Sequence, residues 1–205
     1  MPRDGLHEQG AVTYPLRIWR QTFAFRSKDH GISLTPTALE FPENGTLKTI
    51  DYTRIAGINL MVTHLRHNAK IVQMLISFRD EPTIRVQNSG PYGQPDPGLV
   101  PVWQDFAADL HARLVAGGHH EGIAFLRGFS ETRQKFVRAV MIVASAFFIL
   151  MPIILFIVTA EPRALLALVG GIFFLVPAFR STKANESGTY DPREAAEVIT
   201  KIAEG

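Results

Sequence analysis

The sequence predicts an α+β protein, in which a small antiparallel β barrel or sandwich is capped by one C-terminal helix and followed by a two-helix transmembrane hairpin. Three observations carry this prediction. Turn signals recur every 8–12 residues or so between residues 15 and 89. One amphipathic pattern of helical period follows at about residues 101–116. Two nearly consecutive apolar runs, 139–160 and 164–179, contain no charged side chain.

The composition of the 205 residues, 46% hydrophobic and 20% charged, suits a soluble domain joined to two membrane spans. The net charge of +2 is small and the basic residues are spread along the chain, so we expect no nucleic-acid partner. There is no cysteine, which excludes disulfides, thiolate metal sites and a cysteine nucleophile. The first ten residues, MPRDGLHEQG, lack the apolar core of a signal peptide, so we expect the part before the first apolar run to stay in the cytoplasm.

The N-terminal half reads as a lead-in followed by strands. We expect residues 1–14 to be disordered, because they are polar and contain proline and glycine. From residue 15 onwards, short runs of alternating apolar and polar residues predict strands. Strong turn signals lie between them, at 35–37, 42–45 and 79–82. No helical pattern of 10–15 residues separates the strands, which argues against a parallel sheet.

The helix expected at about residues 101–116 would cap these strands. Pro101 suits the first helical turn, and Gly117 and Gly118 end the pattern. Apolar side chains recur at i, i+3, i+4, i+7 and i+11, on one face: Trp103, Phe106, Ala107, Leu110 and Leu114. We expect this face to pack on the strands, so that residues 15–117 form one domain.

Four segments of this domain carry a resemblance to a known family. They are LTPTAL at 34–39, TIDYTRI at 49–55, ISFRD at 76–80 and WQDF at 103–106. With them, the chain resembles the pleckstrin-homology-like (PH-like) domains of bacterial membrane proteins. The resemblance implies a barrel plugged by its last helix, and a binding or scaffolding module rather than an enzyme. It does not imply phosphoinositide binding, because the region of the family's basic cluster offers only Arg26 and Lys28 beside Asp29.

The two apolar runs predict the transmembrane hairpin. The first span, 137–160, includes an uncharged stretch, 139–160, that as a helix covers about 33 Å, enough for a hydrocarbon core of about 30 Å. The second, 164–180, has an apolar stretch of only about 24 Å. It can span if the bilayer thins locally or if its flanking arginines snorkel, and a re-entrant or interfacial segment is the alternative. Gly171 belongs to a small-xxx-small step that would let a neighbouring helix approach.

The charges beside these runs predict the orientation and the lipid contacts. By the positive-inside rule, both termini face the cytoplasm of a multi-pass protein of the inner (plasma) membrane. Residues 118–136 would be a juxtamembrane linker. Six basic residues are candidate membrane-surface contacts: Arg127, Arg133, Lys135, Arg138, Arg180 and Lys183. The alternative is that these charges act only as topological signals.

The tail, 181–205, is predicted to be cytoplasmic and to contain a short amphipathic helix at 191–203. Asp191 can cap this helix, and Pro192 fits its first position. Its apolar stripe consists of Ala195, Val198, Ile199 and Ile202. The stripe could pack on the soluble domain, lie on the membrane or hold a partner, and packing is the commonest fate of such a stripe.

The residues that usually carry chemistry form no recognisable site. The pairs His64/His67 and His119/His120 lack a third metal ligand nearby. The common nucleophile, zinc-protease and phosphate-loop motifs do not occur. The apolar runs contain no ionisable residue, which argues against a transporter or channel working through them alone. We therefore predict no catalytic residue, no cofactor and no metal.

Three functions remain after these exclusions. The first is a non-enzymatic integral membrane protein whose cytoplasmic PH-like domain binds a protein partner or a second copy of the chain. The second is an accessory subunit of a membrane complex, recognised through its hairpin. The third, a membrane-bound enzyme, has no residue pattern in its favour.

Overall fold

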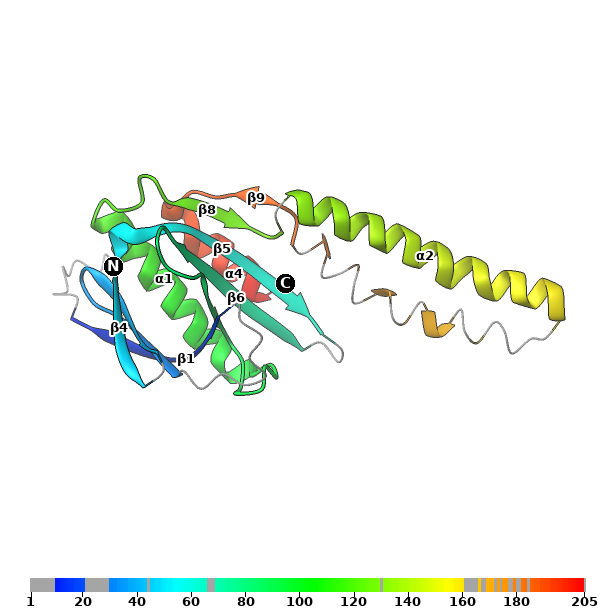
Figure 1. Ribbon diagram of the computed structural model, residues 1–205, viewed down its shortest axis with the longest axis horizontal. Coiled ribbons are helices and arrows are strands. Elements are labelled where there is room, and N and C mark those ends of the chain that lie inside the picture. The colour runs from blue at the N-terminus through cyan, green and yellow to red at the C-terminus, as the bar shows by residue number, and fades with distance from the viewer. Residues whose placement is uncertain are drawn as a thin grey trace, which may run out of the picture.

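The chain forms an α+β structure on one large mixed β-sheet, seen in the computed structural model (Figure 1). The structure describes residues 10–20, 30–43, 45–65, 69–129, 131–160, 182–183 and 185–204, and positions 166, 169–171, 173, 175–176 and 179. The sheet order is β4-β3-β2-β1-β7-β6-β5-β8-β9. The strands are β1 (Val12–Arg20), β2 (His30–Leu34), β3 (Ala38–Glu43), β4 (Thr46–Asp51), β5 (Ile55–His64), β6 (Lys70–Phe78), β7 (Ile84–Gln87), β8 (Ala124–Arg127) and β9 (Gly188–Thr189). The α+β prediction is confirmed at this level.

Strands β1 to β7 form the antiparallel part of the sheet. Strand β1 begins at Val12, which pairs with Leu34. The prediction of disorder is therefore wrong for residues 12–14, because backbone pairing with β2 and a 2.9 Å hydrogen bond from Tyr14 Oη to Asp109 Oδ2 hold them. Residues 1–9 of that predicted lead-in lie outside the described residues.

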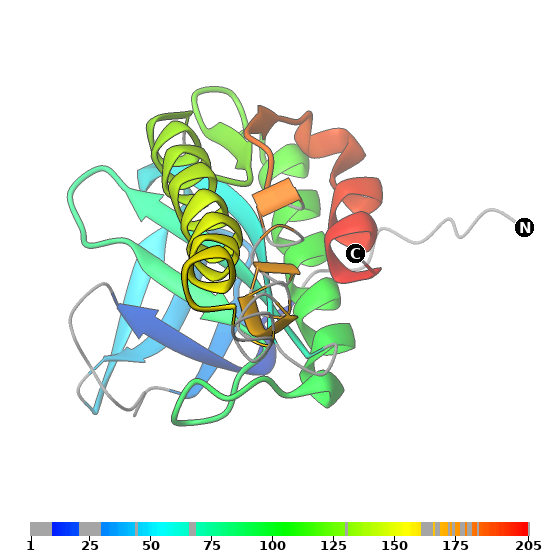
Figure 2. The ribbon, with the colours of Figure 1, turned by 90° about the vertical axis from the view of Figure 1, so that its right-hand side faces the viewer.

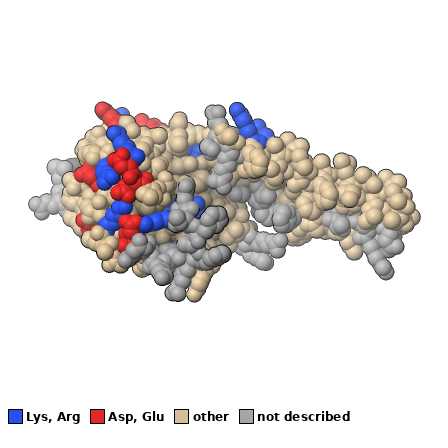
Figure 3. Space-filling model, in the orientation of Figure 1, with Lys and Arg blue, Asp and Glu red and all other residues tan. Residues whose placement is uncertain are grey.

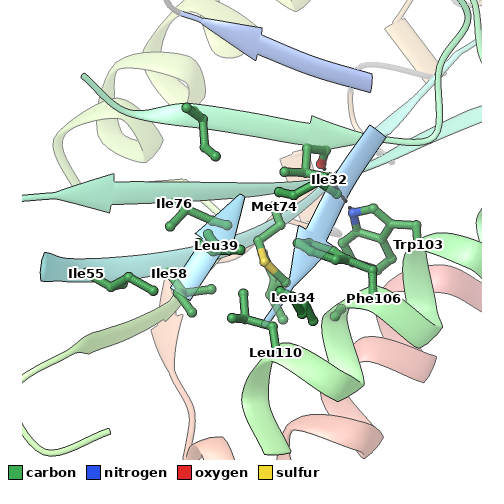
Figure 4. Close-up of a cluster of buried hydrophobic side chains, with 14 of the residues drawn as sticks. Ile32, Leu34, Leu39, Ile55, Ile58, Met74, Ile76, Trp103, Phe106 and Leu110 are labelled. Carbon is green, nitrogen blue, oxygen red and sulfur yellow. Dashed lines mark hydrogen bonds between the residues drawn. The ribbon is translucent and has the colours of Figure 1, made fainter. Parts of the chain in front are cut away.

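The core lies between the sheet and helix α1 (Val100–Ala116), as Figure 4 shows. The predicted apolar face of this helix is buried, with Trp103, Phe106 and Leu110 fully covered and directed at side chains from the strands. The indole Nε1 of Trp103 donates a 3.2 Å hydrogen bond to the Val86 carbonyl, so the buried ring keeps no unpaired donor. Short 3₁₀ helices, Tyr52–Arg54 (η1) and Pro97–Leu99 (η3), lead into β5 and α1.

The segment after α1 extends the domain instead of leaving it. Strand β8 pairs in parallel with β5, with Gly57 opposite Ala124 and Leu60 opposite Arg127. The prediction of a linker at 118–136 is therefore wrong, and so is the expectation of a purely antiparallel sheet. The four-residue strand β8 has one buried side chain and a partner far away in the sequence, so it has no periodic pattern that a local reading could detect.

The C-terminal segment also belongs to the domain. Strand β9 pairs with β8, and the 3₁₀ turn η4 (Pro192–Glu194) leads into helix α4 (Ala195–Glu204). This helix packs on α1 and β5, and Ala195, Ile199 and Ile202 of its predicted stripe join the hydrophobic core. Of the three fates considered for that stripe, packing on the domain is the one observed. The tail is thus an integral part of the fold.

Helix α2 (Glu131–Thr159) projects away from the sheet (Figures 1 and 2). Within the described residues, one helical stretch, Gln134–Thr159, is long and apolar enough to cross a membrane, and 11% of its most apolar window is buried. In the second predicted span, 164–180, the described positions are helical up to Phe179, and the others lie outside the described residues, as does the turn at 161–163. The two-helix hairpin stays a prediction.

Candidate functional site

A hydrogen-bonded junction lies where α2 departs and where the chain returns. We call residues 126–129 and 185–189, together with the edge of β5 that they contact, the neck. Both arms of the neck are bonded to each other and to β5. The Gly128 N–H donates to the Leu60 carbonyl at 2.8 Å, and the Phe129 N–H donates to the Asn185 carbonyl at 3.0 Å. The entrance and the exit of the apolar segment therefore meet at one place on the sheet.

Asn185 closes the neck through its side chain. The Val62 N–H donates to Asn185 Oδ1 at 3.0 Å, and Asn185 Nδ2 donates back to the Val62 carbonyl. The side-chain amide of Asn185 thus makes the two hydrogen bonds that a neighbouring strand would make to Val62, at a point on β5 beyond the end of its pairing with β8. Asn185 is 1% exposed, so loss of these bonds would leave buried backbone groups of β5 unpaired.

Gly128 allows the arms of the neck to approach closely, and Gly188 leaves room for a neighbouring side chain. Gly128 has a φ of +73°, and a Cβ at this position would collide with the carbonyl oxygens of Asn185 and Glu186. At Gly188 a Cβ would lie 2.8 Å from Nε of Arg127, whose side chain passes across this position. The backbone contact at the neck therefore requires a glycine at position 128.

A second junction joins the returning chain to helix α1. The ring of His111 is 2% exposed, with Nδ1 2.7 Å from the Ala107 carbonyl and Nε2 2.8 Å from Oη of Tyr190. A carbonyl can only accept, so Nδ1 carries the proton in this assignment and the Tyr190 hydroxyl donates to Nε2. Phe125 of β8 packs on both rings, with centroids 5.6 and 5.7 Å away. This cluster joins α1, β8 and the segment after β9.

Burial sets the ionisation of this cluster. It lowers the pKa of His111 to about 4, partly opposed by the hydrogen bond to Ala107, and it raises the pKa of Tyr190. The imidazole is therefore neutral at neutral pH. His111 also borders a cleft of about 430 Å³ between α1 and α4, lined largely by alanine and by Pro192 and Arg193. Both ring nitrogens are already hydrogen-bonded, so His111 presents no free base to a substrate there.

The six predicted membrane-surface residues divide into three groups. Lys135, Arg138 and Lys183 come together at the base of α2, where they border two adjoining cavities of about 190 and 330 Å³. Arg127 lies exposed in the neck, beside Gly188. Arg180 and the side chain of Arg133 lie outside the described residues. Figure 3 shows basic side chains at this base, between the charged globular part and the long uncharged surface of α2.

Charges also gather on the globular part, in a network that the sequence analysis did not identify. Lys48 contacts Glu43 at 3.0 Å and Glu81 at 2.5 Å, Glu43 also pairs with Arg20, and Arg54 contacts Glu81 at 3.6 Å. The hydrogen bond to Glu81 is the main reason that the pKa of Lys48 is raised. These charges compensate one another across β1, β3, β4 and the turn after β6, which is typical of a stabilised surface rather than a ligand site.

The described residues show no group of three or more His, Asp or Glu side chains placed to hold a metal ion. His64, His119 and His120 are described, whereas His67 lies outside the described residues. The junctions that the structure reveals, at Asn185 and at His111, carry no local sequence signal beyond the capping pattern that follows Tyr190. Comparisons of the chain with protein-family models, curated proteins and solved structures found no match.

Proposed function

We propose that this protein is a non-enzymatic integral membrane protein that presents a PH-like binding domain at the inner face of the membrane. One observation carries the proposal. The apolar segment is inserted into the globular domain between β8 and β9, and both of its ends are hydrogen-bonded to the same part of β5. A domain tied to its anchor at two adjoining points keeps a defined orientation relative to the membrane, which a single flexible linker would not provide.

The length and exposure of α2 support the membrane assignment. The 26-residue stretch Gln134–Thr159 covers about 39 Å as a helix, more than a hydrocarbon core of about 30 Å. The core helix of a soluble protein would be largely covered, whereas 11% of the apolar window of this helix is buried. A signal sequence would lie near the N-terminus, whereas this stretch starts at Gln134.

The contact between α2 and the following run supports the two-helix hairpin. A Cβ at Gly171 would lie 3.0 Å from the Cβ of Phe148, so the second run approaches α2 closely at this residue. A glycine at such a contact is typical of helices that pack in membranes. The two runs leave and re-enter the domain at the neck, so they would cross the bilayer in opposite directions.

The arrangement of β1 to β7 and α1 supports a PH-like domain. Seven antiparallel strands are followed by one helix that lays a buried tryptophan, Trp103, against them. This is the order and the plug that the resemblance implies. Strands β8 and β9 and helix α4 would then be additions at the β5 edge, which connect the domain to its membrane segment.

The orientation can be tested by labelling, because the chain contains no cysteine. Leu47 on β4 is 69% exposed, and Ala160 follows the end of α2. In intact cells, a membrane-impermeant maleimide should label Ala160→Cys and should label Leu47→Cys only after permeabilisation. Labelling of Leu47→Cys in intact cells would show that the domain faces the outside, which is the opposite orientation. Release of the wild-type protein from membranes by alkaline carbonate would rule out the membrane assignment.

The partner-binding role needs a second experiment. The variant in which residues 131–183 are replaced by a short Gly/Ser linker retains every strand of the domain. Crosslinking and affinity capture with the full chain and with this variant should recover the same protein partner, or the same second copy. If only the full chain captures the partner, the hairpin is the recognition surface and the protein is an accessory subunit of a membrane complex.

A further inference from the structure

We propose that the cleft at the base of α2 binds the phosphodiester headgroup of an anionic glycerophospholipid. This inference rests on the proposed function, because it requires α2 to lie in a membrane. The cleft consists of the two adjoining cavities between α2 and the returning chain, and Arg138 borders both.

The walls of the cleft come from two segments that the fold holds together. Gln134, Arg138, Met141 and Ile142 are spaced at i, i+4, i+7 and i+8, so they share one face of α2. The opposite wall consists of Phe179, Thr182, Lys183, Glu186 and Ser187. A 3.4 Å hydrogen bond from the Ser187 N–H to Gln134 Oε1 joins the two walls. The cleft therefore lies directly beside the neck, between two segments that this hydrogen bond joins.

The lining changes character along the helix in the way that an amphiphile requires. Towards the domain it presents Gln134, Lys135 and Ser187, and Arg138 lies in the middle. One to two turns further along α2 it presents Met141 and Ile142, with Phe179 opposite. Arg138 directly precedes the uncharged stretch, so in a membrane its guanidinium lies at the depth of the lipid phosphates. A glycerophospholipid with its phosphate at the basic end of the cleft and an acyl chain at the apolar end would match this order of residues.

The charges in the cleft favour a singly charged phosphodiester. Lys135, Arg138 and Lys183 bring three positive charges, and no described carboxylate forms an ion pair with any of them. Glu186 borders the same cleft with one negative charge. Its carboxylate disfavours a doubly charged phosphomonoester and can accept a hydrogen bond from a headgroup hydroxyl, as in phosphatidylglycerol.

The test measures phosphatidylglycerol binding to the full-length protein in detergent by native mass spectrometry. The double variant Arg138→Gln/Lys183→Gln should bind this lipid roughly thirty-fold more weakly, about fivefold for each cation removed. The matched control, Arg79→Gln/Arg193→Gln, removes the same charge from exposed positions on the globular domain and should bind within about twofold of wild type. Wild type should prefer phosphatidylglycerol to phosphatidylcholine, and added salt should weaken this preference.

Equal binding by wild type and Arg138→Gln/Lys183→Gln would overturn the proposal. So would displacement of the lipid by an equal concentration of glycerol 3-phosphate, which would make the cleft a site for a soluble phosphate ester. If the double variant does not fold, Lys135→Gln/Lys183→Gln leaves Arg138 in place and should show the same loss. If the wild-type protein resists carbonate extraction but binds the lipid no more tightly than the double variant does, this inference alone fails. If carbonate releases the wild-type protein from membranes, the membrane assignment fails as well.

Discussion

His111 illustrates how one buried polar side chain can connect distant parts of a chain. Its two nitrogens contact the Ala107 carbonyl one turn earlier and the hydroxyl of Tyr190, 79 positions later. Such a pair is favourable in a dry environment because each buried polar atom finds a partner. The same burial excludes the charged form of the ring, so this connection makes stability depend on pH.

The His111 junction predicts a loss of stability in mild acid. The pKa of His111 is about 4 in the folded protein and about 6.5 when the ring is exposed. Between these values the unfolded chain binds a proton that the folded chain does not, so the free energy of unfolding falls as the pH drops from about 6.5 to 4. The full shift corresponds to about 3 kcal/mol. Urea unfolding in detergent, followed by tryptophan fluorescence at several pH values, measures this slope.

The variant His111→Gln should flatten the dependence on pH over this range, whereas a substitution of the exposed His30 by Gln should leave it unchanged. A wild-type stability that stays constant between pH 6.5 and 4.5 would contradict the assignment of a buried neutral ring.

Gly128 predicts a large effect from the addition of a single methyl group. In Gly128→Ala the Cβ would collide with two backbone carbonyls, and the alanine would have to adopt a positive φ, which L residues with a side chain disfavour. The neck would therefore have to open. We expect a loss of roughly 2–4 kcal/mol in the free energy of unfolding. Gly118 has a similar φ of +70° but nothing within 4 Å, so Gly118→Ala isolates the conformational cost, about 1 kcal/mol. Equal losses for the two variants in urea unfolding would argue against close contact at the neck.

Helix α4 shows how a short element gains its stability from packing. A helix of ten residues is marginal on its own, and this one is held by its apolar stripe against α1 and β5. The preceding turn contributes a cap, since Asp191 Oδ1 accepts from the Arg193 N–H at 2.9 Å. The helix is thus stable because the returning chain brings it to a partner surface.

Substitutions in α4 should separate packing from helix propensity. Ile199 is 2% exposed, and Ile199→Ala should lower the free energy of unfolding by about 2–5 kcal/mol through lost burial and a cavity. The exposed neighbour Thr200 is the control, because Thr200→Ala should change stability by less than about 0.5 kcal/mol. Thermal unfolding in detergent would compare them. A harmless Ile199→Ala would mean that α4 does not share the domain core.

The molecule as a whole is a globular domain interrupted by an apolar segment. The N-terminal part supplies β1 to β8 and α1, and the part after the segment supplies β9 and α4. The two parts share one core, in which Phe125 from the first part lies with Ala195 and Ile199 from the second. Neither part completes the fold alone, so the apolar segment and the domain are coupled in position.

This arrangement predicts opposite outcomes for two shortened chains. A chain that ends at Gly117 lacks β8, β9 and α4, so it exposes the edge of β5 and part of the face of α1, and it should aggregate or show no cooperative unfolding. Replacement of residues 131–183 by a linker of about six residues should preserve the fold, because Phe129 and Asn185 are already joined by a 3.0 Å hydrogen bond. Circular dichroism melting compares the two, and a stable Gly117 chain would contradict the shared core.

Much of this structure follows from local patterns. The strands up to β7, the buried face of α1, the apolar helix α2 and the capped helix near the C-terminus are each encoded in a few neighbouring residues, through alternation, helical period, turn signals and length. Trp103 could be placed in the core because its spacing with Phe106 and Leu110 leaves little alternative. The sequence shows that Lys135, Arg138 and Lys183 flank the apolar runs, but it does not show that the three border one cleft.

The sequence was sufficient to establish an α+β domain and an apolar helix long enough to cross a bilayer, because both arise from periodicity within short windows. Three-dimensional folding was needed to show that the chain after the apolar segment returns to complete the domain. That return depends on pairing between distant residues, such as Val62 with Asn185 and His111 with Tyr190, whose partners no local pattern specifies. Contacts of this kind form only when the whole sheet brings their ends together.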